Sequence, residues 1–232
     1  MPEQKEKLGV KFLDELLNGG VPAKSIILVE GTSGIGQNVL LYHFLFQGVR
    51  EQDRAVYVFS GHLLDEILDE FESYSMEVKK GEISWVDASN SNEDPAITPC
   101  DLSELFTVSS AIKKNLAGKK SKTQQTRLAM DMVSPALMSN DSSEVYKFLS
   151  SLISELKKNN VTAMLVIEDA MHDPHVVASI EQLCDGVIEM KAIEKDLEIE
   201  TVLRIKKMRN IPPFQKCYRY KVTGEGIVEK RE

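Results

Sequence analysis

Cysteine is scarce in this sequence, with only three residues in a chain of 232. Cys100, Cys184 and Cys217 are widely spaced and form no C-x-x-C pair. This spacing excludes an ordinary zinc motif and argues against a disulfide framework. We therefore expect three reduced, inert thiols.

Basic residues are outnumbered, with 28 Lys and Arg against 36 Asp and Glu and a net charge of −8. That balance argues against the uniformly basic face of a non-specific nucleic-acid binder, although local basic patches remain open. No apolar run approaches the roughly 20 residues needed to span a bilayer, and the first seven residues carry no apolar signal segment. We expect a cytoplasmic protein with one domain over residues 1–232 and no internal repeat.

What the sequence does contain is a glycine-rich loop, directly after the apolar run 25–30 and before the helical pattern 39–45. The order of strand, glycine loop and helix is that of a P-loop, whose backbone N–H groups and helix N-terminus wrap a phosphate. A purely structural turn is the alternative. The loop reads Gly31-Thr32-Ser33-Gly34-Ile35-Gly36-Gln37-Asn38.

This loop lacks two side chains that the full motif G-x-x-x-x-G-K-[ST] requires. The motif needs a Lys to reach the β- and γ-phosphates and a hydroxyl to hold Mg²⁺. Gln37 and Asn38 occupy those two positions. Both can donate hydrogen bonds to phosphate oxygens but carry no charge, so we expect ATP or ADP to bind more weakly than in an intact loop.

Apolar strand patterns alternate with helical patterns along most of the chain. This alternation predicts an α/β fold with a mainly parallel sheet flanked by helices, and the alternating C-terminal segments predict antiparallel edge strands. The polar stretch 88–99 and the lysine-bearing tract 118–126 are expected to be exposed loops. Strands are expected at 25–30, 55–60, 83–87, 127–131, 163–168, 185–190, 201–209 and 218–222, and helices at 13–17, 39–48, 63–71, 102–116, 144–159 and 180–184.

Asp131 ends one of these apolar strands. At the carboxyl edge of a parallel sheet it would lie beside the glycine loop, where it could hold a metal-bound water and so place Mg²⁺. The alternative is an Asp that caps the following turn.

The order of these features resembles the KaiC-like branch of the RecA-type ATPases, which includes relatives of the archaeal recombinase RadA. Residues 9–22 match the family segment G-x-x-x-L-D-x-L-L-x-G-G-[LIV]-P, and the strand ending at Asp131 looks like its Walker B strand. Residues 183–190 and 224–228 resemble two later family strands, and Lys207-Met208-Arg209 resembles its K-x-R finger. The resemblance implies a RecA-like P-loop fold over nearly the whole chain.

The resemblance also shows what is missing. The family places its general-base glutamate just after the second strand, where this chain has Ser60-Gly61-His62. His62 could take up a proton or could simply begin a helix. Without the Lys, the hydroxyl and the Glu, we expect negligible hydrolysis, because one such group typically contributes about 3–4 kcal/mol to transition-state stabilisation.

The leading hypothesis is a catalytically impaired, KaiC-type pseudo-ATPase acting as a regulatory or assembly module. Lys207 and Arg209 would reach the phosphates of a second copy, or of a KaiC/RecA-like relative, in a ring or filament; a solvated edge strand is the alternative. The rival functions are a working ATPase with a non-standard site and a RadA-paralogue-like repair protein that binds single-stranded DNA through Lys119-Lys120-Ser121-Lys122.

Overall fold

A ten-stranded sheet forms the centre of the computed structural model, which describes residues 4–117, 125–195, 198–212, 214 and 216–230. The strand order is β12-β11-β10-β9-β3-β8-β7-β4-β5-β6. The strands from β9 to β6 are parallel, and β10, β11 and β12 continue the sheet in antiparallel pairs. The predicted α/β fold, mainly parallel with antiparallel C-terminal strands, is confirmed.

The central strands are buried on both faces. In β3 (Ile26–Gly31), Ile27 and Val29 join one hydrophobic cluster, whereas Ile26 and Leu28 join the other. This division follows from the side-chain period of two along a strand. It explains why the sequence shows continuous apolar runs here. The other strands of this sheet are β4 (Arg54–Phe59), β5 (Ile83–Asp87), β6 (Ile97–Pro99), β7 (Thr126–Asp131), β8 (Val161–Glu168), β9 (Gly186–Lys195), β10 (Glu198–Met208), β11 (Tyr218–Thr223) and β12 (Gly226–Glu229).

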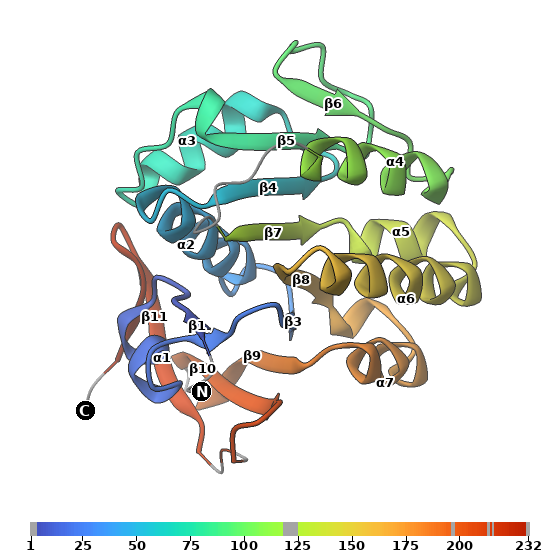
Figure 1. The fold of residues 1–232 in the computed structure, drawn as a ribbon. Helices are drawn as coiled ribbons and strands as arrows, with labels where there is room; N and C mark the ends of the chain where they lie inside the picture. Colours follow the sequence, from blue (N-terminus) through green and yellow to red (C-terminus); the bar gives the residue numbers. More distant parts are fainter. Residues whose placement is uncertain (1–3, 118–124, 196–197, 213, 215, 231–232) are drawn as a thin grey trace.

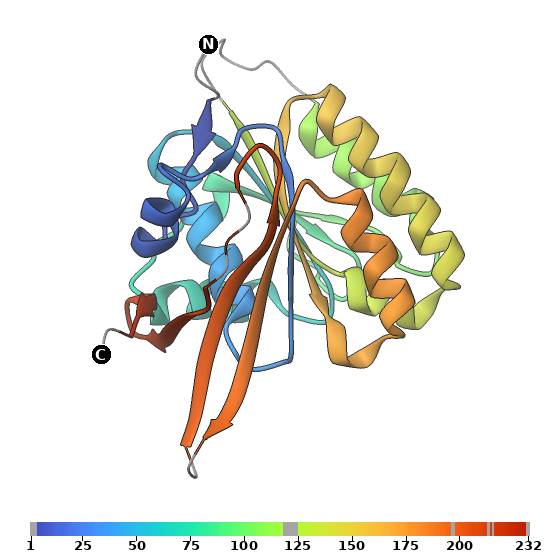
Figure 2. The same cartoon turned by 90° about the horizontal axis from the view of Figure 1, so that it is seen from below.

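Helices cover both faces of the sheet (Figure 2). One face carries α1 (Lys11–Leu16), α2 (Gln37–Arg50) and α3 (Leu64–Ser73). The other face carries α4 (Leu105–Leu116), α5 (Val133–Ser139), α6 (Ser142–Lys158) and α7 (Pro174–Leu183). Among the described residues, no helix combines the length and the apolar character that a membrane span requires.

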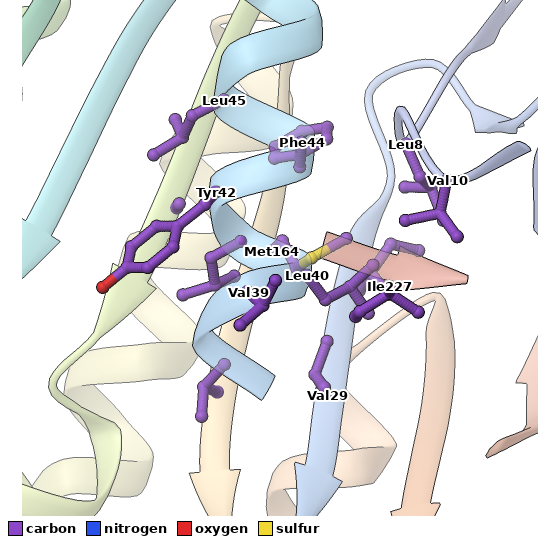
Figure 3. Close-up of a cluster of buried hydrophobic side chains, with 14 of the residues drawn as sticks. Leu8, Val10, Val29, Val39, Leu40, Tyr42, Phe44, Leu45, Met164 and Ile227 are labelled. Atoms are coloured by element: carbon purple, nitrogen blue, oxygen red, sulfur yellow. The ribbon is translucent and has the colours of Figure 1, made fainter. Parts of the chain in front are cut away.

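The helix after the glycine loop, α2, is enclosed by parts of the chain far apart in sequence. The N-terminal segment and β12 pack along it (Figure 3). Its His43 Nε2 accepts a hydrogen bond from the backbone N–H of Ile227 at 2.9 Å. Burial lowers the pKa of His43 to about 4, so the neutral ring is the form that makes this contact. The two ends of the chain therefore hold α2, and the loop before it, in place.

The N-terminal segment forms a second, two-stranded sheet in which β1 (Lys5–Glu6) pairs with β2 (Val21–Pro22). The predicted turn of helix is α1, which lies between these two strands, and Asn18 and the two following glycines have positive φ where that turn ends. Left-handed geometry of this kind ends a helix and suits glycine.

Two predicted boundaries are corrected by the structure. The stretch 88–99 is not entirely an exposed loop, because β6 pairs with β5 and Ala88 is fully buried. The segment after Asp131 is the helix α5 rather than a turn. Of the predicted lysine-bearing loop 118–126, residues 118–124 lie outside the described residues and Thr126 begins β7.

The β9–β10 hairpin extends beyond the body of the sheet as a two-stranded ribbon (Figure 2). Its pairing runs from Met208 opposite Gly186 to Glu198 opposite Lys195, although β3 accompanies β9 only as far as Met190. Ile193 and Ile199, near the tip, are 47% and 71% exposed.

Candidate phosphate-binding site

The glycine loop connects the end of β3 to the start of α2 at the carboxyl edge of the sheet (Figure 1). Gly34 and Gly36 have φ of +83° and +99°, a left-handed geometry that L side chains rarely adopt. Gly31 has no room for a side chain either, since an added Cβ would lie 2.5 Å from the Met190 carbonyl oxygen. The loop thus has the backbone shape that a phosphate cradle requires.

Gln37, at the lysine position, places its side-chain amide close to Gly31 and lines the cleft at the loop. It is 4% exposed, and its Nε2 lies 3.3 Å from where a Cβ on Gly31 would be. Among the described residues, this buried amide nitrogen finds no hydrogen-bond partner. A buried donor without an acceptor is costly and calls for an explanation, and one explanation is a ligand oxygen.

Asp131 ends β7 and lies beside the glycine loop, as the sequence predicted, close enough to Asn38 for this side chain to affect its pKa. Burial raises the pKa of Asp131 to about 6; His62 and Asn38 lower it, and Glu168 and Glu70 raise it. The carboxyl group therefore lies among two other acids and one imidazole.

A cleft of about 270 Å³ opens above the loop. Among the described residues that line it, the charged ones are Glu70 and Glu168, and none is a lysine or arginine. Its walls include Tyr74 of α3 and Val222 of β11. The cleft is thus acidic where an intact P-loop would be basic.

The C-terminal hairpin, formed by β11 and β12, lines one wall of this cleft and contacts the glycine loop. The Tyr220 hydroxyl donates a hydrogen bond to the Ile35 carbonyl at 2.6 Å. An added Cβ on Gly36 would lie 2.8 Å from Cγ2 of Val222. The sequence suggested a family strand here but gave no sign of this contact, because the two segments are almost 200 residues apart.

His62 lies in the turn between β4 and α3, exposed, and close enough to Asp131 to affect its pKa. Asn92 fixes this turn, since its Nδ2 donates to the His62 carbonyl at 3.0 Å and its Oδ1 accepts from the Leu64 N–H at 3.0 Å. Asn92 is held in turn by the buried carboxylate of Asp87, at 2.8 Å. Sequence reasoning missed this network, although Asp followed by Ser and Asn after a strand indicates such turns.

Lys207 and Arg209 lie near the amino ends of the parallel strands, whereas the glycine loop lies at their carboxyl ends. Met208 between them pairs with Gly186, which pairs with Ile27, four residues before the end of β3 or about 13 Å of strand. Lys207 Nζ donates to the carbonyls of Glu181 and Cys184 at 3.1 and 2.6 Å.

Arg209, which is 67% exposed, forms an ion pair with Asp185 at 3.1 Å. The structure therefore does not bring either finger residue to the glycine loop of its own chain.

A parallel sheet carrying a glycine loop, a helix N-terminus and an aspartate together at its carboxyl edge defines a P-loop nucleotide-binding domain. A family model described as "ATPase: KaiC" matches residues 6–231. The chain belongs to this KaiC family, within the RecA superfamily of P-loop ATPases, which confirms the resemblance seen in the sequence.

Individual relatives agree with this assignment. A UPF0273 protein of Thermotoga maritima is 24% identical over 96% of this chain and 94% of its own length. The circadian clock oscillator protein KaiC of Parathermosynechococcus lividus is 25% identical over 96% of this chain but only 42% of its own length. The crystal structure of a KaiC-like protein from Pyrococcus horikoshii OT3 has a TM-score of 0.77 at 22% identity, covering 99% of this chain and 100% of that one, and is evidence of a shared fold.

Proposed function

We propose that this KaiC-like domain binds ATP or ADP without turning it over, and acts as a regulatory or assembly module. The observation that carries the proposal is the Nε2 of Gln37, a buried donor at the cleft that finds no partner within the described part of the chain. An oxygen of a bound phosphate would satisfy it. The loop amides and the positive end of α2 supply the remaining attraction.

Hydrolysis requires more than this cradle. Phosphoryl transfer depends on positioned groups that neutralise the charge of the transition state and orient the attacking water. Gln37 and Asn38 are neutral, and the turn after β4 offers Gly61 and His62 in place of a carboxylate. With each such group typically worth about 3–4 kcal/mol, the combined loss favours a site that binds and does not cleave.

The test is phosphate release from purified protein under saturating ATP and Mg²⁺. We expect no rate above a buffer blank. The double substitution Gln37→Lys and Asn38→Thr should raise nucleotide affinity without producing turnover. Turnover in that double variant would refute the part of the proposal that assigns the defect to the turn at Gly61 and His62.

A working ATPase with a non-standard site is the alternative outcome of the same assay. It would release phosphate steadily, and Asp131→Ala would abolish that release. Glu72→Gln, on the exposed face of α3, serves as a matched control because Glu72 is a carboxylate outside the cleft. Loss of the rate in the Asp131 variant alone would establish an active site and overturn the proposal.

We further propose that Lys207 and Arg209 act on a neighbouring subunit. They lie too far from the glycine loop of their own chain, and heterologous contacts of this kind close into rings or continue as filaments. A neighbour's phosphate would have to replace the Asp185 carboxylate that Arg209 now contacts.

Light scattering with and without ATP tests self-assembly through these two residues. If the protein proves strictly monomeric, these two residues could act only in a mixed assembly with an intact relative. If Arg209→Ala then failed to lower the ATPase rate of a co-purifying relative, both cations would be ordinary edge-strand charges.

A further inference from the structure

The place where a P-loop protein holds its metal ion is built differently here. An intact loop holds Mg²⁺ between the hydroxyl that follows its lysine and an aspartate on a neighbouring strand. Asn38 stands at the hydroxyl position, lines the cleft, and lies close enough to Asp131 to lower the pKa of that carboxyl group. A neutral carboxamide thus lies next to the carboxylate where an intact loop would place a hydroxyl.

The surrounding residues do not compensate for this change. Within the part of the chain that the structure describes, no three His, Cys, Asp or Glu side chains are grouped so as to hold a metal ion. Gln37 adds a second neutral amide rather than an anionic ligand. The residues present at this site therefore do not fit a resident Mg²⁺.

The charged side chains that line the cleft are acidic. Because β8 lies between β3 and β7 in the sheet, its last residue, Glu168, lies between the glycine loop and Asp131. Its backbone N–H donates to the Ser134 hydroxyl at 2.9 Å, which fixes the end of the strand. Glu70 lines the same cleft and accepts a hydrogen bond from the Tyr42 hydroxyl.

These groups divide the cleft into two parts of different chemistry. The loop amides and the unpartnered Nε2 of Gln37 offer neutral donors to the phosphates that sit in the cradle. A third phosphate would extend toward Glu168, a cleft residue near Asp131, where a metal ion would otherwise neutralise its charge. Here it would meet carboxylates, and like charges at short range in a partly buried cleft repel strongly.

We infer that this site takes a nucleoside diphosphate without a metal ion and discriminates against the triphosphate. The inference rests on the proposed nucleotide site and specifies its ligand. A domain with this preference would act as a sensor of the nucleoside diphosphate. The Asn38 amide takes the place of the cation, and the acids of the cleft exclude a terminal phosphate.

Calorimetric titration of the full chain with ADP and with ATP, each in EDTA and in Mg²⁺, tests the inference. We expect the ADP dissociation constant to agree within about twofold between EDTA and Mg²⁺, and ATP in EDTA to bind at least about tenfold more weakly than ADP. Glu168→Gln should recover about fivefold of the ATP affinity and leave ADP within about twofold. Glu72→Gln, an exposed carboxylate of α3 outside the cleft, should change neither.

The outcomes separate this inference from the proposed function. Binding of neither nucleotide under any condition would refute the proposed nucleotide site itself. ATP binding as tight as ADP binding, or a gain of tenfold or more from Mg²⁺, would keep the nucleotide site and overturn the inference. A Glu168→Gln variant that improves ADP and ATP equally would also overturn it, because the acid would then repel both ligands and not the third phosphate.

Discussion

The contact between the C-terminal hairpin and the glycine loop can be tested with two glycines that share a backbone geometry. Gly36 and Gly34 both have positive φ. A Cβ on Gly36 would lie 2.8 Å from Cγ2 of Val222, whereas a Cβ on Gly34 would meet no atom of the described residues within 4 Å. Gly34→Ala therefore introduces backbone strain alone, and Gly36→Ala introduces the same strain together with a steric clash.

The magnitudes follow from these two terms. Left-handed geometry costs an L residue roughly 1–2 kcal/mol, which is the expected loss for Gly34→Ala. Overpacking this half-exposed contact should cost about 1 kcal/mol more, the low end of the range for cores, so Gly36→Ala should lose roughly 2–3 kcal/mol. Urea-induced unfolding, followed by circular dichroism, measures both values as free energies of unfolding.

A double-mutant cycle isolates the clash. Val222→Ala removes the atom that Gly36→Ala would strike, so the pair should be less destabilising than the sum of the two single variants by about 1 kcal/mol or more. The same cycle built on Gly34 should show no coupling. Equal losses at the two glycines, together with additive behaviour in the Gly36 cycle, would refute the packing of the hairpin on the loop.

Two further predictions concern charged groups at the N-terminal sheet: Arg127 of β7, which contacts the chain at Lys7, and Glu6 of β1. Arg127, which is fully buried, pairs with Asp53 at 2.8 Å and with the half-exposed Glu51 at 2.5 Å. Arg127→Met should cost about 3–5 kcal/mol in urea unfolding, mainly because it leaves the Asp53 carboxyl, only 7% exposed, without its partner; a loss below 1 kcal/mol would contradict this. Burial raises the pKa of Glu6 to about 7, so its carboxylate form disfavours the fold and the stability that Glu6 contributes is lost as pH rises from about 4.5 to 7. Glu6→Gln should match the wild type near pH 4.5 and exceed it at pH 8 by up to about 3 kcal/mol, and a variant with an unchanged pH dependence would refute the assignment.

Local patterns predicted the main features of the fold. Continuous apolar runs such as the one in β3 are typical of strands buried on both faces, and their alternation with helices favours a parallel sheet. The position of Asp131 followed for the same reason, because parallel strands end at one edge. Neither step required knowledge of any contact between distant residues.

The elements that were missed depend on such contacts. Ile97 to Pro99 becomes a strand only because β5 offers an edge there, and polar composition alone indicated a loop. The brace from Tyr220 to Ile35 joins segments 185 residues apart. The distance of Lys207 from the glycine loop follows from the register of β10 on β9, which one sequence does not reveal.

The most direct test of nucleotide binding by the glycine loop is a titration of isotope-labelled protein with ADP, followed by amide NMR. We predict the largest shifts at the backbone N–H groups of Gly34 and Gly36 and at the side-chain amide of Gln37, as its unpartnered Nε2 gains an acceptor. Signals of Tyr146 and Ser179, in the hollow between α6 and α7, should stay unchanged. A Gln37 side-chain amide that does not move at saturating ADP, or shifts confined to the α6–α7 hollow, would contradict the account.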